Sequence, residues 1–231
     1  MVLEGFHALK HALRFGADIM QVVTADPDLV RVLGGRLAPD VTEAMLARAV
    51  PVAAETFAQL APVPPDTAIM ALARRPAVDP GQLLAAPRTA PLVFLESPTH
   101  LGNVGAVIRV AAAAGAAGVV TSGPHDPWHP TAVRGSAGLH FALPVGRVAA
   151  LDYDSLQGPL LTVHPEGEPL APGAVPGNAV LAFGSERRGL SDQLLARAGG
   201  RLTIPMEPGI SSLNLATAVA VVLYTWRLGH P

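Results

Sequence analysis

The sequence contains no cysteine, which excludes disulfide bonds and thiolate metal sites. It also lacks an apolar run long enough to cross a membrane, because the longest, residues 213–226, spans only about 14 residues and includes three polar ones. The first five residues lack the basic and then apolar order of a secretory signal. These absences favour a cytoplasmic protein and predict a buried helix at residues 213–226.

An excess of positive charge is missing as well. The chain has 16 Lys and Arg residues against 18 Asp and Glu, a formal net charge of −2. Nucleic-acid-binding proteins usually carry a basic excess, so this balance favours a protein of small-molecule metabolism. RNA binding would require arginines to cluster in space, and the candidates are Arg109, Arg134, Arg187 and Arg188.

Lysine is nearly absent, since Lys10 is the only one among the 16 basic residues. Arginine binds phosphate in a bidentate manner more readily than lysine does. The composition, rich in Ala, Pro and Gly, is typical of a GC-rich genome and explains the arginine preference at least as well. We therefore favour the compositional cause.

The length of 231 residues, with 50% hydrophobic and 15% charged residues, is sufficient for the core of one large domain or two small ones. Four prolines and a glycine in residues 74–91 interrupt both helical and strand periodicity, which predicts a linker with one helical turn at 82–86. We place a domain boundary there, with a small α/β unit at residues 1–87 and a second unit at 88–231.

Hydrophobic periodicity predicts the elements of both units. In the first, we expect helices near residues 4–15, 29–33, 41–49 and 55–60, a strand at 19–24, and apolar runs at 50–53 and 68–73. In the second, we expect strands at 92–95, 118–121, 160–163, 180–183 and 202–204, separated by helical or loop segments at 104–114, 131–136, 192–198 and 213–228. Alternation of strands and helices predicts a mostly parallel α/β sheet.

The first segment that could carry chemistry reads Leu-Gly-Asn-Val-Gly-Ala-Val-Ile-Arg over residues 101–109. Gly102 and Gly105 allow a tight turn or a close approach to another segment or ligand, and the following helix offers free N–H groups. A dinucleotide-binding turn is the alternative. It is disfavoured because the Gly-x-Gly-x-x-Gly spacing is absent and the next strand ends without an acidic residue, at residues 121–123.

Arg109 stands in an otherwise apolar part of this segment and therefore needs a partner. That partner is either a carboxylate, such as Glu96 or Glu186, or the phosphate of a ligand.

Two further segments follow predicted strands. Residues 183–190, Phe-Gly-Ser-Glu-Arg-Arg-Gly-Leu, put Glu186 at the carboxyl edge of the sheet, where ligands of open α/β sheets bind. A role at the start of the next helix is an equally good interpretation. In residues 204–214, we expect Ser211 or Ser212 to cap the last helix, which leaves the amide of Asn214 available to a ligand or to backbone.

No other pattern of site residues emerges. The eight histidines lack the spacing and acidic neighbours of a metal set, so we expect no metal. Residues 184–186 lack the second glycine of a nucleophile elbow.

In this order, the three segments resemble the motifs of the SpoU/TrmH RNA 2'-O-methyltransferases. The similarity covers roughly residues 91–231 and extends to His-Pro-Thr-Ala-Val-Arg-Gly-Ser-Ala-Gly at 129–138. Residues 4–9 resemble the opening of a small substrate-binding domain, similar to a ribosomal large-subunit protein, that many rRNA-modifying members carry. The resemblance implies a trefoil-knotted, mostly parallel-sheet methyltransferase domain after a small α/β substrate-binding domain, and a homodimer formed through helices near the knot.

The resemblance also implies a set of site residues. The family's motif positions fall on Asn103, Arg109, Glu186, Ser212 and Asn214, which are the expected catalytic residues. The expected S-adenosyl-L-methionine pocket comprises Thr121, Gly123, Phe183, Gly184, Ile204, Met206, Ser212, Leu213 and Asn214. One departure is that Ser-Pro-Thr-His at 97–100 replaces the Asp-Pro-x-Asn of many members, which bears on substrate alignment more than on cofactor binding.

The implied chemistry is attack of a ribose 2'-oxygen on the activated methyl group, with positioning and deprotonation both contributing to the rate. Arg109 stands at the position of the family's proposed base. Because guanidinium is very hard to deprotonate in a protein, Arg109 is alternatively a clamp for the adjacent phosphate that stabilises the alkoxide.

The resemblance favours RNA as the partner, and the amino-terminal unit favours large-subunit rRNA over tRNA. A tRNA 2'-O-methyltransferase stays as an alternative within the enzyme interpretation. From another class, the alternative is a non-catalytic RNA-binding or ribosome-assembly protein that kept the fold, which the joint presence of the motif residues disfavours. A small-molecule nucleotide-using enzyme is supported only by the charge balance.

Overall fold

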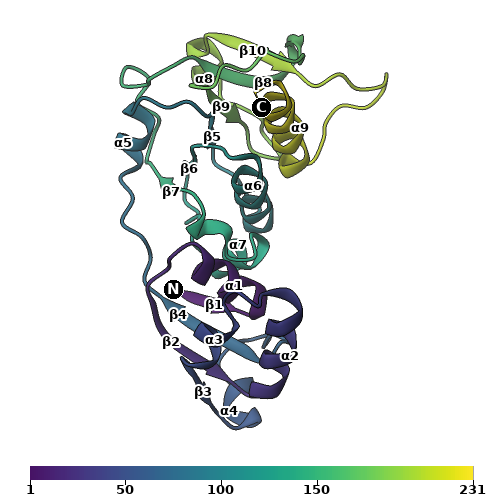
Figure 1. The fold of residues 1–231 in the computed structure, drawn as a ribbon. Coiled ribbons are helices and arrows are strands. Elements are labelled where there is room, and N and C mark those ends of the chain that lie inside the picture. Colours follow the sequence, from purple (N-terminus) through teal and green to yellow (C-terminus); the bar gives the residue numbers. More distant parts are fainter. Residues whose placement is uncertain (231) are drawn as a thin grey trace.

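The computed structural model describes residues 1–230, which form two β-sheets with their surrounding helices (Figure 1). The first sheet lies in the amino-terminal part of the chain, and the second lies at the opposite end of the molecule, with the segment before α5 (Pro80–Ala85) running between them. Within residues 1–230, no helix has both the length and the apolar character required to cross a bilayer.

The amino-terminal sheet has four strands in the order β1-β4-β2-β3. Its strands β1 (Val2–Glu4), β4 (Ile69–Ala73) and β2 (Ile19–Thr24) pair antiparallel, and β3 (Ala49–Pro51) joins β2 in parallel. The helices of this part are α1 (Phe6–Arg14), α2 (Pro27–Leu37), α3 (Thr42–Leu46) and α4 (Ala54–Ala58). Helix α2 begins where the Asp26 side chain accepts a hydrogen bond from the Leu29 N–H, with Pro27 in the first turn.

The second sheet has six strands in the order β10-β8-β9-β5-β6-β7, and all its pairs are parallel. The strands are β5 (Leu92–Leu95), β6 (Gly118–Thr121), β7 (Val145–Arg147), β8 (Leu160–Pro169), β9 (Val180–Phe183) and β10 (Gly200–Thr203). The helices are α5, α6 (Leu101–Ala114), α7 (Pro130–Gly135), α8 (Asp192–Arg197), α9 (Leu215–Gly229) and the short 3-10 helix η1 (Leu139–Phe141).

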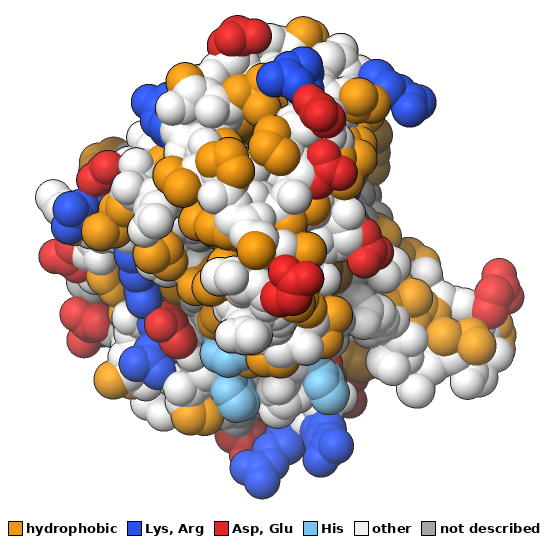
Figure 2. Space-filling view, turned by 90° about the horizontal axis from the view of Figure 1, so that it is seen from below, with side chains coloured by type: hydrophobic (Ala, Val, Ile, Leu, Met, Phe, Trp, Pro, Cys, Tyr) orange, Lys and Arg blue, Asp and Glu red, His pale blue; other side chains and the backbone are white. Residues whose placement is uncertain are grey.

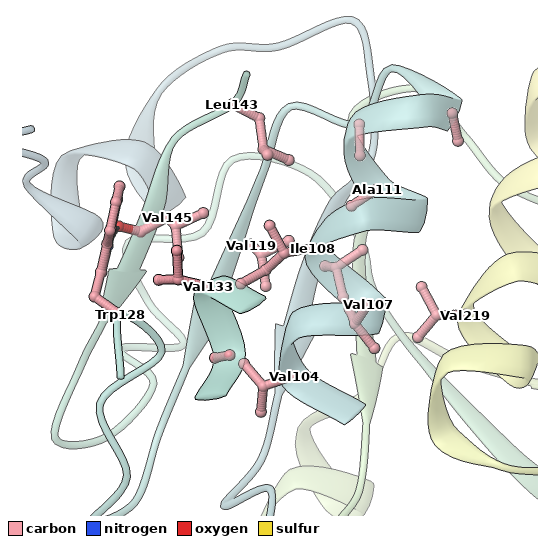
Figure 3. Close-up of a cluster of buried hydrophobic side chains, with 14 of the residues drawn as sticks. Val104, Val107, Ile108, Ala111, Val119, Trp128, Val133, Leu143, Val145 and Val219 are labelled. Carbon is pink, nitrogen blue, oxygen red and sulfur yellow. Dashed lines mark hydrogen bonds between the residues drawn. The ribbon is translucent and has the colours of Figure 1, made fainter. Parts of the chain in front are cut away.

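Helices cover both faces of this sheet, which explains why its central strands read as unbroken apolar runs. Every residue of β5, β6 and β9 is buried. Alternate strand residues such as Val93 and Leu95 pack with α6 and α9, whereas Leu92 and Phe94 pack with Leu84 of α5 and Leu194 of α8. Figure 3 shows the first of these layers, with α6 lying between β6 and α9.

The amino-terminal part packs directly on this core. Leu3, Phe6 and Leu9 belong to the same hydrophobic cluster as residues of α6 and α7. The approach is close at Gly138, where a Cβ would overlap the backbone of Ala8. His11 Nδ1 lies 2.7 Å from the Ala137 carbonyl oxygen, which adds a polar contact across the same junction.

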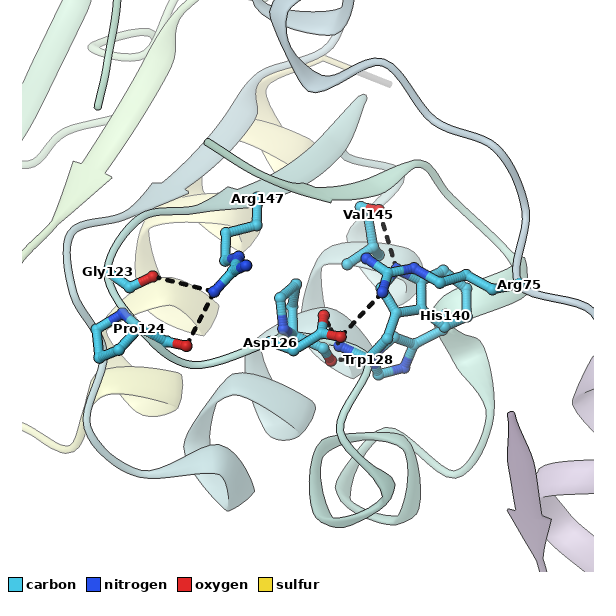
Figure 4. Close-up of polar contacts among 9 residues, drawn as sticks. Arg75, Gly123, Pro124, Asp126, Trp128, His140, Val145 and Arg147 are labelled. Carbon is cyan, nitrogen blue, oxygen red and sulfur yellow. Dashed lines mark hydrogen bonds and ion pairs between the residues drawn. The ribbon is translucent and has the colours of Figure 1, made fainter. Parts of the chain in front are cut away.

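The segment between β4 and α5 is held by an aromatic and ionic contact (Figure 4). Arg75 pairs with Asp126 at 2.9 Å, and its guanidinium lies 5.4 Å from the centre of the Trp128 ring. The Trp128 indole in turn donates to the Val145 carbonyl at 3.0 Å, which fixes the ring against β7.

Most expected elements of the second sheet are confirmed. Three strands, at residues 92–95, 118–121 and 180–183, begin and end at the predicted residues. The prediction that α6 begins near residue 104, after a glycine turn, is wrong. The helix begins at Leu101, so Gly102 and Gly105 both lie inside it. The short strands β1 and β7 were not predicted, and β8 extends to Pro169, six residues beyond its predicted end at 163.

We expect Gly105→Ala to destabilise the fold and Gly102→Ala not to. A Cβ at Gly105 would overlap the Ala132 carbonyl oxygen and lie 2.9 Å from the Gly135 Cα, whereas at Gly102 nothing lies within 4 Å. Overpacking at Gly105 should cost roughly 1–3 kcal/mol, while Gly102→Ala should gain up to about 1 kcal/mol of helix propensity. Denaturant unfolding of both variants measures the difference, and equal effects would contradict this account of the α6–α7 contact.

Candidate functional site

A cavity of about 620 Å³ opens at the carboxyl edge of the parallel sheet. It is bounded by the middle of β8, the ends of β9 and β10, and the first residues of α6 and α9. Nineteen residues line it: His100, Asn103, Val163, His164, Pro165, Phe183, Gly184, Ser185, Glu186, Gly189, Thr203, Ile204, Met206, Ser211, Ser212, Leu213, Asn214, Leu215 and Ala218. All three sequence segments therefore contribute to one site.

A chain of hydrogen bonds connects these segments. The Glu186 carboxylate accepts hydrogen bonds from the Asn103 amide at 2.8 Å and from the Thr99 backbone N–H and hydroxyl at 3.0 and 2.7 Å. Asn103 Oδ1 accepts a hydrogen bond from Asn214 Nδ2 at 3.1 Å. The loop after β9 is thereby linked to the starts of both α6 and α9.

These contacts determine the charge state of Glu186. Partial desolvation raises the pKa of Glu186, but the hydrogen bonds from Asn103 and Thr99 favour the ionised form more strongly and lower the pKa to about 2. The group is thus a carboxylate near neutral pH. A carboxylate with so low a pKa is a poor proton acceptor, so its contribution is to hold its hydrogen-bond donors in place.

Asn214 begins α9, and the prediction that Ser211 or Ser212 caps this helix is wrong. The Asn214 Oδ1 accepts hydrogen bonds from the N–H groups of Ala216 at 2.9 Å and Thr217 at 3.4 Å. Its Nδ2 is directed the other way, to Asn103. One side chain therefore caps the helix and joins the site, while both serines are exposed at the cavity.

Gly184 permits the sharp turn that carries Glu186. A Cβ at Gly184 would overlap the backbone of Gly189 and Leu190, and Ser185 and Gly189 exchange two backbone hydrogen bonds of 3.0 Å across the turn. Gly184 is thus required for close backbone packing, whatever the cavity binds. The next helix, α8, is capped by Ser191, so Glu186 is not its start residue.

Arg109 lies apart from this hydrogen-bonded chain. It lines a second cavity of about 650 Å³ between α1 and α6, together with His7, Lys10 and Arg134. Neither proposed carboxylate partner reaches it, because Glu186 binds Asn103 and Thr99, and Glu96 accepts hydrogen bonds from the Ser191 N–H and hydroxyl at 2.7 and 2.6 Å.

Two expected pocket residues, Thr121 and Gly123, also lie outside the lining of the first cavity. Thr121 ends β6 and is buried, and Gly123 has a φ of 83° and lies against Ser97.

The four arginines that would have to cluster for RNA binding divide into two groups. Arg109 and Arg134 line the second cavity, and Arg134 pairs with Glu4 there. Arg187 and Arg188 are exposed in the turn beside Glu186. On the face seen in Figure 2, basic, acidic and apolar side chains are intermixed, and Lys and Arg side chains lie at its top, left and lower edges.

Sequence reasoning missed several residues of the first cavity. Thr99 was identified only as part of a departure from the family pattern, yet it donates twice to Glu186. His100, Val163 and His164 line the cavity without belonging to any of the three segments. The position of Thr99 and His100 directly after a predicted strand was the available signal for those two.

The lining fits an adenosyl group. Apolar side chains such as Phe183, Ile204 and Leu213 can cover the faces of a base, and the backbone at the ends of β9 and β10 can contact its polar edges. Among residues 1–230, no three His, Asp or Glu side chains are grouped so as to hold a metal ion.

Comparison with known proteins is consistent with this geometry. Residues 90–224 match the SpoU rRNA Methylase family model. A relative from Streptomyces laurentii, a 23S rRNA (adenosine(1067)-2'-O)-methyltransferase, is 33% identical over 141 residues, covering 58% of this chain and 52% of the relative. The chain spans about half the length of the curated relatives that it matches.

Solved structures share the fold over nearly the whole chain. A crystal structure of an RNA 2'-O ribose methyltransferase is 26% identical with a TM-score of 0.75, covering 99% of this chain and 87% of that one. The SpoU methyltransferase AviRb from Streptomyces viridochromogenes, solved in complex with AdoMet, is 24% identical with a TM-score of 0.76, covering 97% and 88%. The family match over more than half of the sequence shows that this chain belongs to the SpoU rRNA methylase family.

Proposed function

We propose that this protein transfers a methyl group from S-adenosyl-L-methionine to a ribose 2'-hydroxyl of RNA. The observation that carries the proposal is the convergence of three separate sequence segments on one cavity at the carboxyl edge of a parallel sheet. Membership of the SpoU family supports it, as do the AdoMet complex of AviRb and the named activity of the Streptomyces laurentii relative.

S-adenosyl-L-methionine supplies an activated methyl group that a ribose 2'-oxygen attacks in line. We assign its binding to the apolar and backbone groups at 183–186, 204–206 and 212–214. Glu186, Asn103 and Asn214 hold these segments at fixed separations through their hydrogen bonds. The exposed hydroxyl of Ser212 and the imidazole of His100 are left to contact the ribose, and imidazole is the side chain most often used as a proton acceptor.

Large-subunit rRNA is the substrate that we favour, because the relatives with a named nucleotide act on 23S rRNA. A tRNA substrate is the alternative. We further propose that the chain divides into a substrate-binding domain (1–87) and a trefoil-knotted methyltransferase domain (88–231), and that it acts in the cytoplasm, where ribosomes assemble.

We propose a homodimer as well. Apolar side chains on α9 and on the loop before it are exposed, including Ile210 at 57%, Tyr224 at 42% and Leu228 at 82%. A second copy of this chain would remove them from water.

Calorimetric titration with S-adenosyl-L-methionine and, in parallel, with NAD tests the proposal first. We expect one S-adenosyl-L-methionine per chain and no heat with NAD. Labelled methyl transfer to purified rRNA and tRNA then identifies the substrate, and a 2'-O-methyl product is recognised because that linkage survives alkaline hydrolysis. Binding of NAD, or no S-adenosyl-L-methionine binding with and without RNA, would overturn the proposal.

Asn214→Asp should separate helix capping from the role of this residue in the site. Asp retains the oxygen that accepts from Ala216 and Thr217 and caps as well as Asn. It replaces the Nδ2 donor to Asn103 with an oxygen. We expect unfolding free energy within about 0.5 kcal/mol of wild type and methyl transfer slower by roughly 10–100-fold.

The matched control for this variant is Asn214→Ala, which loses both functions and should cost about 1 kcal/mol of stability as well as activity. Full turnover by Asn214→Asp would show that the hydrogen bond to Asn103 has no role in the reaction.

The pKa of Glu186 leads to a pH-dependent stability. Because the folded-state pKa of about 2 is below the ordinary value of 4.5, ionisation of Glu186 stabilises the fold above about pH 4.5, and this contribution is lost as pH falls toward 2. The stability difference between wild type and Glu186→Gln should be constant from about pH 5 to 8 and shrink below that range.

Urea unfolding at a series of pH values measures this effect. Glu166→Gln is the control, since the Glu166 carboxylate makes no hydrogen bond within the described part of the chain. A difference for Glu186→Gln that stays the same down to pH 3 would refute the hydrogen-bonded carboxylate.

A further inference from the structure

The cavity between α1 and α6 contains the only lysine of the chain. Only 9% of the Lys10 surface is exposed. The residue lines the cavity of about 650 Å³ together with Arg109, Arg134 and His7. A buried ammonium normally has a carboxylate partner. Within residues 1–230, no carboxylate lies within 4.0 Å of the Lys10 ammonium, and its hydrogen-bond partner is His7 Nδ1 at 3.3 Å.

The contact with His7 determines what both groups offer to a ligand. An ammonium has only donors, so His7 Nδ1 must accept, and the proton of the neutral ring is then on Nε2. Burial, followed by the charges of Lys10 and Arg109, lowers the pKa of His7, which favours the neutral ring. The remaining ammonium protons, the His7 Nε2–H and the guanidinium of Arg109 are all donors.

The cavity is lined by three cations, Lys10, Arg109 and Arg134, and by two carboxylates, Glu4 and Asp66. Arg134 is neutralised by Glu4, whereas Arg109 has no ion-pair partner among residues 1–230. Asp66 is the other carboxylate of the lining, and it pairs with none of these cations. Burial and the charges of Arg14 and Arg109 lower the pKa of Lys10 more than the charge of Asp40, which pairs with Arg14, raises it. Three donors and two unpaired cations around one cavity fit a phosphate group.

The position of the cavity indicates where this phosphate comes from. Arg109 follows Asn103 by six residues on α6, which is about 9 Å along the helix axis. Asn103 lines the first cavity and Arg109 the second. Every nucleotide of an RNA strand carries one phosphate, so a strand with a ribose in the first cavity has phosphates within reach of the second.

We propose that Lys10, His7 and Arg109 form a phosphodiester-binding site, through which the amino-terminal part and the parallel-sheet part of the protein hold the same RNA strand. This inference rests on the proposed function for the identity of the strand. It assigns Lys10 a role in substrate binding and none in the binding of S-adenosyl-L-methionine.

Lys10→Met tests the site, because Met keeps an unbranched apolar stem in the buried position and removes the charge. Fluorescence anisotropy with a fluorescein-labelled, single-stranded RNA of mixed sequence gives the dissociation constant at several salt concentrations. We expect roughly ten-fold weaker binding at low salt and a salt-dependence slope reduced by about 0.7, the share of one phosphate contact.

Arg31→Gln is the matched control. It removes one positive charge from the same part of the chain, at an exposed residue paired with Asp28 and outside the cavity. Its slope should equal that of wild type. An unchanged slope for Lys10→Met, or an equal reduction in Arg31→Gln, would overturn the proposal.

A second measurement needs no substitution at Lys10. Reductive methylation with ¹³C-formaldehyde labels only the Lys10 amine and the chain terminus, because the chain has a single lysine. Methylation keeps the charge, and the NMR signal of Lys10 reports its pKa. A phosphate bound to Lys10 must raise this pKa, so a titration curve unchanged at saturating RNA would also refute the site.

Failure of this inference and failure of the proposed function are distinguishable. Normal methyl transfer to rRNA with unaltered RNA binding by Lys10→Met would remove only the phosphate site. Lys10-dependent RNA binding by a protein that does not bind S-adenosyl-L-methionine would remove only the proposed reaction.

Discussion

The hydrogen-bonded carboxylate of Glu186 is the constraint on which the first cavity depends. Its three donors come from Thr99 and Asn103, more than 80 residues earlier in the chain, and Asn103 in turn receives a hydrogen bond from Asn214. Loops at a sheet edge are normally the most mobile part of an α/β fold. Here three of them are fixed to one another by side chains, so the cavity can be formed before any ligand arrives.

Helix α6 connects this cavity to the second one. Asn103 and Arg109 are six residues apart, so their side chains point roughly 120° apart around the helix. Glycine at 105 brings α7 against the same helix, and glycine at 138 brings α1 close to η1, which puts Lys10 opposite Arg109. The small size of these glycines therefore determines how the two parts of the chain meet.

Burial on both faces made the central strands predictable, because residues 92–95 and 180–183 are apolar at every position. Strands β1 and β7 have only three residues each, and β1 is defined by pairing with β4, some 70 residues away, which no local pattern reveals. The same limit applies to the site. The family motifs identified Glu186 and Asn214, but Thr99 became a partner of Glu186 only through a contact across 87 residues, and the cap of α9 was assigned to the wrong side chain.

The absence of a basic excess constrains how RNA can be bound. A protein with a net charge of −2 gains little from general attraction to phosphates, so its affinity has to come from a few well-placed contacts. Lys10, which has no ion-pair partner among residues 1–230, suits this requirement, because its ammonium can bind a phosphate without first breaking an ion pair. Arg134 should contribute less to RNA affinity, because its ion pair with Glu4 must be broken or shared before Arg134 can bind a phosphate. Because the unpaired cations are few and lie in one cavity, only an RNA strand that passes both cavities can be bound in this way. Binding of the phosphate therefore also positions the reacting ribose.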